Sequence, residues 1–256
     1  VLIDRSVVKG ASDAGIYVGQ SQNIIVRNSR AEMNVAGIEI ENSYDADVVG
    51  NTATNNAGGI LVFDLPDLPQ QGGRNVKLTN NQVIANNHVN FAAPGNIVAG
   101  VPSGTGIMVM ANARVMVENN HVMGNNGSAV MVVAYTQAFT DQAYNPLPRD
   151  VSVAGNHFMD NGKAPAFKGG KEIAAAVGGT LPPVLWDGIT RYAVPGGGGE
   201  KMAEGGINSD APGISLNLGL QGTPATQAKP APMQANLVVS TRPAIVLPAA
   251  LEARAK

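Results

Sequence analysis

The chain is poor in three kinds of residue. It has no cysteine, which excludes disulfides, thiolate metal sites and a cysteine nucleophile. Charged residues make up 14% of it and aromatic residues 4%, whereas an ordinary globular domain is about 25% charged. With 17 Lys and Arg against 19 Asp and Glu, the net charge of −2 offers no positive field to nucleic acid. No apolar run approaches the roughly 18 residues of a membrane span, so we expect no nucleic-acid partner and no membrane span.

What the chain does contain is a repeat. The pairs Gly15-Ile16, Gly37-Ile38 and Gly59-Ile60 recur every 22 residues, each within a short stretch of alternating apolar residues. A fixed period of this length is typical of a solenoid that adds one coil per repeat. The predicted fold is therefore all-β, with parallel strands stacked in coils of about 22 residues.

Asparagine recurs at two places in each repeat. The first row, in which Ser6 stands in the first coil, comprises Asn28, Asn51, Asn81, Asn120 and Asn156. The second row follows five or six residues later and comprises Asn34, Asn56, Asn87, Asn126 and Asn161. Asparagine tolerates the left-handed conformation, and its amide can hydrogen-bond along a stack. We therefore expect structural ladders of asparagine at the corners between strands.

Three insertions interrupt the period, at 64–74, 88–105 and 136–149. Each flanks the Gly-Ile strand of its coil, so all three should rise from one face of the solenoid. Insertions gathered on one face usually mark a binding face.

The repeats become irregular toward the C-terminus. Residues 1–161 contain 22 asparagines, whereas residues 162–256 contain 3. We predict parallel β-helix repeats over 1–190, then a Gly-rich linker and a degenerate last coil over 191–222. Segments 181–188 and 213–218 are the candidates for degenerate coils. An Ala/Pro-rich tail over 223–256 should be extended, with a short helix from Ala249 to Lys256. Because Val1 falls inside an expected strand, we also expect that N-terminal coils and an export signal are missing.

The repeated Gly-Ile-x-(Val/Ile) and Val-x-x-Asn patterns resemble the right-handed parallel β-helix proteins of the pectin-lyase-like superfamily. The runs 11–21, 34–42 and 59–69 are similar to a family of exported bacterial β-helix repeat proteins whose biochemical role is unassigned. The resemblance covers roughly residues 1–190. It implies a right-handed parallel β-helix and an exported protein of the periplasm or cell surface. It implies no activity.

Strand alternation predicts what the loop-flanked face presents to its surroundings. If the isoleucines of the Gly-Ile pairs point inward, one outward column is Tyr17, Glu39, Leu61, Met108 and Met131. The next outward column is Gly19, Glu41, Phe63, Met110 and Val133. From the third coil onward this face is apolar. We expect the insertions to cover it through residues 65–69, Phe139, Tyr144 and Leu147, and the alternative is an open hydrophobic groove.

Catalysis on this face is the enzymatic alternative. The superfamily's lyases and epimerases need acidic groups, often with Ca²⁺, and a base near the sugar carboxylate. The charged candidates here are Glu39, Glu41, Asp64, Asp67, Arg74, Asp141 and Arg149. No Asp-x-Asp or Asp-Asp pair lies on the face, which disfavours hydrolase chemistry. We expect bound Ca²⁺ only under this enzymatic alternative, and otherwise we expect no cofactor.

His121 and His157 each follow an asparagine of the first row, so stacking should bring them about 4.8 Å apart. They form a weak candidate for a metal or pH-sensitive pair. The simpler interpretation is an outward polar column that continues from Gln82.

The hypothesis that these features favour is an exported β-helix protein that presents a loop-decorated face to a polysaccharide or another exported protein. A polysaccharide-active enzyme of lyase or C5-epimerase type is the alternative. A purely structural envelope protein is the third.

Overall fold

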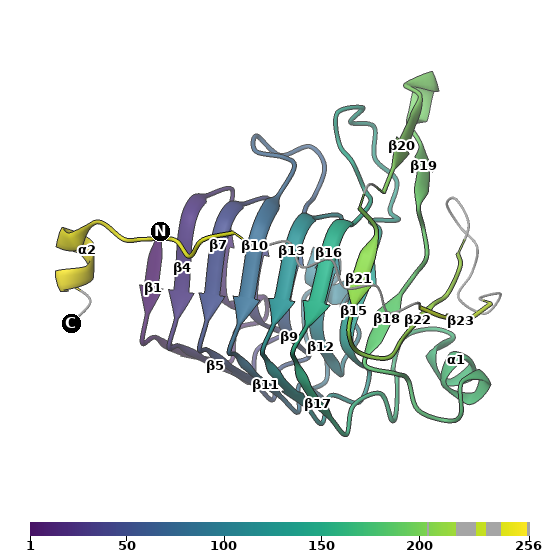
Figure 1. The fold of residues 1–256 in the computed structure, drawn as a ribbon, viewed down its shortest axis with the longest axis horizontal. Coiled ribbons are helices and arrows are strands. Elements are labelled where there is room, and N and C mark those ends of the chain that lie inside the picture. Colours follow the sequence, from purple (N-terminus) through teal and green to yellow (C-terminus); the bar gives the residue numbers. More distant parts are fainter. Residues whose placement is uncertain (204, 219–228, 234–241, 255–256) are drawn as a thin grey trace.

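The computed structural model describes residues 1–203, 205–218, 229–233 and 242–254, and they form a stack of three-stranded coils (Figure 1). Sheet A contains β1 (Leu2–Asp4), β4 (Gln22–Arg27), β7 (Tyr44–Val49), β10 (Arg74–Thr79), β13 (Ala113–Glu118), β16 (Arg149–Ala154) and β21 (Ile207–Ser209). Sheet B contains β2 (Val7–Lys9), β5 (Arg30–Glu32), β8 (Thr52–Thr54), β11 (Gln82–Ile84), β14 (His121–Met123) and β17 (His157–Met159).

Sheet C contains β3 (Ala14–Gly19), β6 (Ala36–Glu41), β9 (Gly58–Phe63), β12 (Thr105–Met110), β15 (Ser128–Val133), β18 (Val184–Trp186), β22 (Gly213–Ser215) and β23 (Ala231–Pro232). All pairings in the three sheets are parallel except that of β22 with β23. The molecule is a parallel β-helix, as the repeat predicts.

The hydrophobic core runs along the inside of the stack, where the three sheets face one another. Sheet C contributes Ile16, Ile38, Ile60, Ile107 and Val130, which pair in register from coil to coil and are buried. Sheets A and B add smaller aliphatic residues such as Val48, Val76 and Val83. The period-2 alternation of the strands thus places every second side chain in a shared apolar interior, as with Ile38 and Ile40 in β6.

The first asparagine row is a hydrogen-bonded ladder at the corner between sheets A and B. The Nδ2 of Asn81 donates to the Oδ1 of Asn120 and to the carbonyl of Val48, both at 2.9 Å. The Asn81 Oδ1 accepts from the backbone and side-chain nitrogens of Asn51, at 3.0 and 3.1 Å. Asn120 bonds to Asn156 in the same way. Four of the five predicted asparagines, from Asn51 to Asn156, therefore lie in one row, of which Asn51, Asn81 and Asn120 are buried.

Asn28 is not part of this ladder, and its prediction was wrong. Ser29 occupies that position: its backbone nitrogen donates to the Oδ1 of Asn51 at 3.0 Å. Asn28 is exposed, with a φ of 50°. It lies in the left-handed turn that precedes each ladder residue, a place held elsewhere by Gly50 and Asn80. Asparagine suits both places, so the sequence alone did not distinguish them.

The second asparagine row lies at the corner between sheets B and C. In two coils the asparagine of this row is the residue before the predicted one. The Oδ1 of Asn86 accepts from Asn56 at 2.8 Å, and its Nδ2 donates to Asn125 at 3.1 Å. Asn86 and Asn125 are therefore the ladder residues, whereas Asn87 and Asn126 were predicted. The predicted pair makes a separate link outside the ladder, in which the Asn126 backbone nitrogen donates to the Asn87 Oδ1 at 2.8 Å.

The glycine of each Gly-Ile pair lies against the next coil. A Cβ on Gly37 would lie 2.5 Å from the carbonyl oxygen of Gly59 and 2.8 Å from the amide nitrogen of Asn56. A Cβ on Gly59 would lie 2.5 Å from the carbonyl oxygen of Gly106. The repeated glycine is therefore required for close packing of the strand against the neighbouring coil and its asparagine ladder.

We expect Gly59→Ala to lower the free energy of unfolding by about 1–3 kcal/mol, because the buried methyl group overpacks a site that has no room for it. The same Cβ would also meet Val83 at 2.5 Å. Urea unfolding followed by circular dichroism measures the effect. Gly100→Ala is the matched control, since no atom lies within 4 Å of its Cβ, and it should stay within about 0.5 kcal/mol. Equal stabilities of the two variants would contradict this explanation.

The stack of coils continues into the C-terminal part of the chain, where a linker was predicted. The predicted degenerate coils at 181–188 and 213–218 contain β18 and β22, which extend sheet C. The predicted Gly-rich linker is instead part of an antiparallel hairpin of β19 (Arg191–Ala193) and β20 (Glu200–Met202), with the short 3-10 helix η2 (Pro195–Gly197) in its turn. The ring of Tyr192 from β19 stacks on Phe139, with centroids 5.1 Å apart. This contact packs the hairpin against the third insertion.

Residues 242–254 return to the first coils, where α2 (Ala249–Arg254) lies at the N-terminal end of the stack (Figure 1). Arg242 pairs with Asp47, and Arg27 pairs with Glu252 at 3.1 Å. The predicted terminal helix is present as far as the structure describes it, from Ala249 to Arg254. Residues 223–228, 234–241 and 255–256 of the predicted tail lie outside the described residues. Neither α2 nor α1 (Gly170–Ala176) is long and apolar enough to cross a membrane, which holds for every helix in the described ranges.

Candidate functional site

The outward face of sheet C carries two columns of side chains that run from coil to coil. The strand register gives the first column as Tyr17, Glu39, Leu61, Met108, Met131 and Leu185. It gives the second column as Gly19, Glu41, Phe63, Met110 and Val133. Both predicted columns are therefore correct. The face is polar and acidic over β3 and β6, and apolar from β9 onward.

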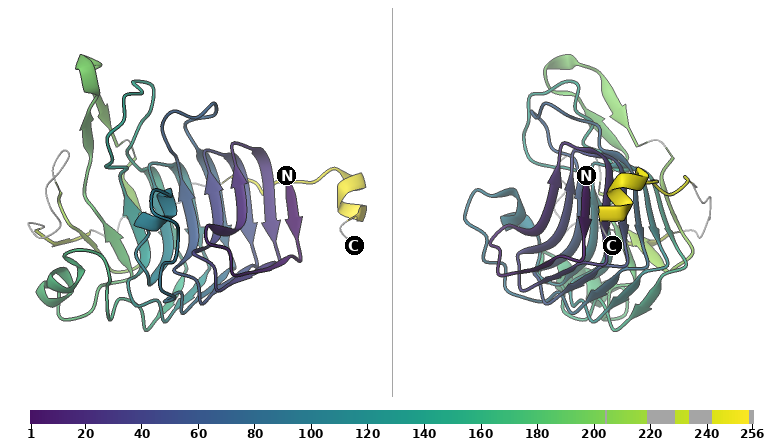
Figure 2. Two further views of the ribbon diagram at one scale, coloured as in Figure 1. Left: turned by 180° about the vertical axis from the view of Figure 1, so that it is seen from behind. Right: turned by 90° about the vertical axis from the view of Figure 1, so that its left-hand side faces the viewer.

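The three insertions flank this face from the two ends of the strands of sheet C (Figure 2). Insertions 64–74 and 136–149 follow the ends of β9 and β15, whereas 88–105 leads into β12. Between them, Leu61 and Phe63 are fully buried, and Met108 and Met131 are each 6% exposed. The prediction that these four side chains are shielded from water is confirmed.

The cover over these four side chains differs from the predicted one. Phe139, Tyr144 and Leu147 are buried, but they form a separate apolar cluster that packs against Met110, and Leu65 is only half-buried. The larger part over Leu61 and the methionines was missed. It includes Val98 from the 3-10 helix η1 (Ile97–Gly100), Val101 directly after this helix, and residues of α1. The apolar run 97–98 inside an insertion was the one sequence signal for it.

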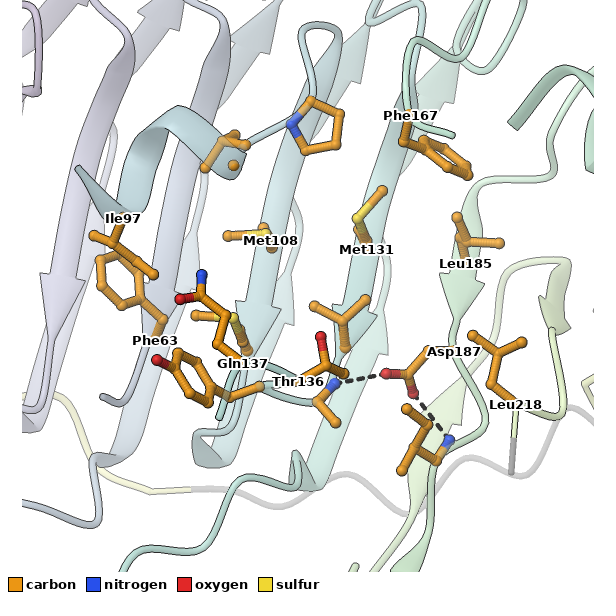
Figure 3. Close-up of a pocket in the computed structure, with 18 of the residues that line it drawn as sticks. Phe63, Ile97, Met108, Met131, Thr136, Gln137, Phe167, Leu185, Asp187 and Leu218 are labelled. Atoms are coloured by element: carbon orange, nitrogen blue, oxygen red, sulfur yellow. Dashed lines mark hydrogen bonds between the residues drawn. The ribbon is translucent and has the colours of Figure 1, made fainter. Parts of the chain in front are cut away.

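A pocket of about 330 Å³ remains open between the cover and sheet C (Figure 3). Its floor is the apolar outward face of β9, β12, β15 and β18. Its walls come from η1, from the residues after β15, from Phe167, and from the last coil. The lining residues are Phe63, Ile97, Val98, Gly100, Val101, Pro102, Met108, Met110, Met131, Val133, Ala134, Tyr135, Thr136, Gln137, Phe167, Leu185, Asp187, Ile189, Leu216 and Leu218.

An aromatic cluster holds the wall beside Tyr135. The Tyr135 ring lies edge-on to Tyr144, with centroids 5.7 Å apart, and Phe139 lies edge-on to Tyr144 at 4.9 Å. The Tyr144 hydroxyl donates to the carbonyl of Asp64 at 2.6 Å, which joins the third insertion to the first. The wall is therefore fixed by packing and by a buried hydrogen bond.

Asp187 is the acidic residue of the pocket. Its Oδ2 accepts from the backbone nitrogen of Ala134 at 2.6 Å, and its Oδ1 accepts from that of Ile189 at 3.0 Å (Figure 3). The side chain is 5% exposed, and burial raises its pKa to about 7 although both hydrogen bonds act in the other direction. Sequence reasoning missed this group, because the segments that orient it are irregular.

Glu41 and Tyr17 form a pair at the acidic end of the same face. The Tyr17 hydroxyl donates to the Oε1 of Glu41 at 2.8 Å. Its ring lies across Gly19, where a Cβ would collide with it. Burial raises the pKa of Glu41, and the Tyr17 hydrogen bond opposes that shift. The glycine in the second column therefore makes room for the tyrosine to reach Glu41.

Glu39 lies beside this pair and is 2% exposed. Its Oε1 is buried and has no hydrogen-bond partner among the described residues. Burial, followed by the charges of Asp13 and Glu41, raises the pKa of Glu39 to about 8. Burial and these two acidic neighbours therefore favour the protonated, neutral form of the Glu39 side chain.

The remaining charged candidates hold the insertions together. Asp64 is buried and accepts from the backbone nitrogens of Gly72 and Gly73, at 2.9 and 3.0 Å, and burial raises its pKa to about 6.

The other four candidates lie on the insertions or at their ends. Asp141 accepts from Gln71 and from the backbone nitrogen of Asp67. Arg74 lies over the ring of Tyr44, 3.8 Å from its centroid. Arg149 donates to the carbonyl of Leu147 at 2.6 Å. None of these four residues, and not Asp64 either, is among the described residues that line the pocket.

His121 and His157 are paired in register on β14 and β17, with ring centroids 5.5 Å apart, and both are exposed. Gln82 is the neighbour of His121 on β11. The described ranges contain no group of three His, Asp or Glu side chains that could hold a metal ion. The two histidines continue an exposed polar column from Gln82.

These observations define the class of the molecule: it is a right-handed parallel β-helix protein with a loop-covered pocket on one face. A family model described as "Right handed beta helix region" matches residues 1–83. No curated protein matches the chain significantly.

One solved structure with a similar fold is the A-module of the mannuronan C-5 epimerase AlgE6 from Azotobacter vinelandii. It is 18% identical, with a TM-score of 0.43, over 82% of this chain and 52% of that one. The present chain thus spans about half the length of that solved chain. A similarity of this degree supports no conclusion about activity.

Proposed function

We propose that the protein is a binding protein whose loop-covered pocket takes an apolar group of its ligand. The single observation that carries this proposal is the pocket of about 330 Å³ over the methionine-rich part of sheet C. Pockets of this size with mainly apolar walls and few polar groups are the usual form of small-ligand sites. Methionine adapts its shape to different ligands.

The lining favours an apolar group over a bare sugar ring. Among the described side chains of the lining, only Tyr135, Thr136, Gln137 and Asp187 carry polar atoms. The hydroxyl groups of a buried sugar would lack partners against the rest of the wall, and each unpaired group costs free energy. A polysaccharide or a protein partner fits the site through an apolar substituent or side chain. Export to the periplasm or cell surface is a proposal that rests on the sequence resemblance.

The pocket can be tested by filling it. We expect 1-octanol to give a saturable heat of binding in isothermal titration calorimetry, because burial of its chain removes apolar surface from water. Met131→Trp should abolish this heat, since the indole would occupy the space over the sheet. Met159→Trp is the matched control, because Met159 is 49% exposed on sheet B and its substitution leaves the pocket unchanged. Binding that survives Met131→Trp would contradict the proposal.

The enzymatic alternative would use Glu39 and Glu41, and the specific observation in its favour is their differing environments. Burial favours the protonated form of Glu39, whereas Glu41 accepts from Tyr17, an arrangement that can divide acid and base roles. Against this stands the local charge. Asp13 and Glu41 are the charged groups that shift the pKa of Glu39, and both are acidic. A uronate carboxylate would therefore meet repulsion rather than a cation at this position.

We accordingly expect no unsaturated product, absorbing in the near ultraviolet, when pectate or alginate is incubated with the protein, with or without Ca²⁺. β-Elimination requires a cation near the carboxylate as well as a base. The Glu39→Gln and Glu41→Gln variants serve as internal references. If the wild-type protein formed product and either variant did not, the chain would be a lyase and the binding proposal would need revision.

A further inference from the structure

We propose that the ligand of this pocket carries a cationic amino group on an apolar body, and that the carboxylate of Asp187 pairs with the amino group. This inference rests on the proposed function, because it requires that the pocket binds a ligand at all. It adds the chemical class of that ligand.

The first argument is the composition of the pocket wall. Of its described lining residues, Asp187 and Tyr135 are the two that titrate, and none is Lys, Arg or His. Among these residues the wall holds one acidic group and no basic group. Thr136 and Gln137 add uncharged polar groups, and the rest of the described lining is apolar. A ligand that fills this space meets a single site of negative charge.

The second argument is the way in which Asp187 is held. Two backbone N–H groups, from Ala134 and Ile189, bind one oxygen each. Such bonds favour the charged form of a carboxyl and fix its orientation. Each oxygen of a carboxylate has a second lone pair, so the group can still accept from a ligand. The site thus presents an oriented carboxylate whose acceptor capacity is partly unused.

The third argument is the missing counter-charge. Asp187 is 5% exposed, and none of the interactions that shift its pKa comes from a charged residue of the described chain. A carboxylate buried without a cation is costly, and burial accordingly raises the pKa of Asp187 to about 7. An ammonium group would supply the missing charge in a place from which water is largely excluded, where such a pair is strong.

A purely structural role is the competing explanation. Asp187 would then only tie the segment after β15 to the segment after β18, and the pocket would not distinguish an amine from an alcohol. The two explanations differ in their result for two probes of equal length.

The experiment compares n-octylamine with 1-octanol by titration calorimetry of the full chain at pH 8. We expect the amine to bind about tenfold more tightly, as for a hydrogen bond to a charged group. Asp187→Asn should remove this preference while 1-octanol still binds. Asp160→Asn is the matched control, because Asp160 is an exposed residue outside the pocket lining that pairs with Lys163.

A second measurement uses the wild-type protein and so does not depend on folding of the variant. Between pH 8 and pH 5.5 the amine stays protonated, but Asp187 takes up a proton, so amine affinity should fall several-fold while 1-octanol affinity stays constant. Tyr135 is the other titratable lining residue, and burial raises its pKa further above this range.

The outcomes separate the two proposals. Equal affinities for amine and alcohol would overturn the role of Asp187 and leave the apolar pocket standing. If neither probe bound, the proposed function would fail and this inference with it.

Discussion

Asn81→Ala should destabilise the protein by about 3 kcal/mol or more, because one side chain satisfies several buried groups. Its amide supports the carbonyl of Val48 and the side chain of Asn120, and its Oδ1 satisfies the backbone nitrogen of Asn51. Each buried group left without a partner costs about 1–3 kcal/mol. Equilibrium unfolding in urea, followed by far-ultraviolet circular dichroism, measures the loss.

Asn80→Gly provides the control for this variant in the adjacent residue. Asn80 is exposed, with a φ of 55°, and Gly50 and Gly155 occupy the same turn position in other coils. Glycine adopts a positive φ without strain, so this change should alter stability by less than about 0.5 kcal/mol. A comparable loss in both variants would show that the turn, rather than the ladder, stabilises the corner.

The protein should be more stable near pH 5 than near pH 8.5. Burial raises the pKa of Glu39 to about 8, of Asp187 to about 7 and of Asp64 to about 6. The unfolded chain releases these protons near pH 4. Between pH 4 and pH 8 the folded state therefore holds more protons than the unfolded state, and the free energy of unfolding falls as the pH rises.

The expected loss between pH 5 and pH 8.5 is on the order of a few kcal/mol, because a tenfold difference in proton affinity is worth about 1.4 kcal/mol. Thermal unfolding at a series of pH values would show it as a melting temperature that declines toward alkaline pH. Glu39→Gln should flatten this decline, whereas the same substitution at the exposed Glu200 should not. A melting temperature that rises from pH 5 to pH 8.5 would contradict the assignment of these buried acids.

The periodic part of the fold was predictable because every stacked coil repeats the same local structure. The Gly-Ile pairs fixed the strand register, and the register fixed both outward columns of sheet C. The errors arose where two neighbouring residues satisfy the same rule. Asn28 lies next to Ser29, and Asn86 next to Asn87, and either member of each pair suits a tight corner. A shift of one residue changes which side chain enters the ladder.

The pocket was not predictable in the same way. Its floor follows from the strand columns, but its walls combine Val98, Tyr135 and Asp187 from irregular segments that are distant in sequence. No period relates these segments, so their meeting is a result of tertiary packing. The Gly-rich stretch at 196–199 illustrates the same limit. Its composition is typical of a flexible linker, and its order depends on hairpin pairing and on the contact of Tyr192 with Phe139.

The return of residues 242–254 to the first coils has a consequence for folding order. In a simple solenoid each coil touches only its neighbours, so an end can fray without disturbing the rest. Here the pairs Arg242–Asp47 and Glu252–Arg27 join residues 195 and 225 positions apart. These are contacts of very high sequence separation, whose closure is entropically slow. The coils that contain Arg27 and Asp47 therefore reach their native environment only after residues 242–254 are made and bound, and protection of their amides from hydrogen exchange should mature late.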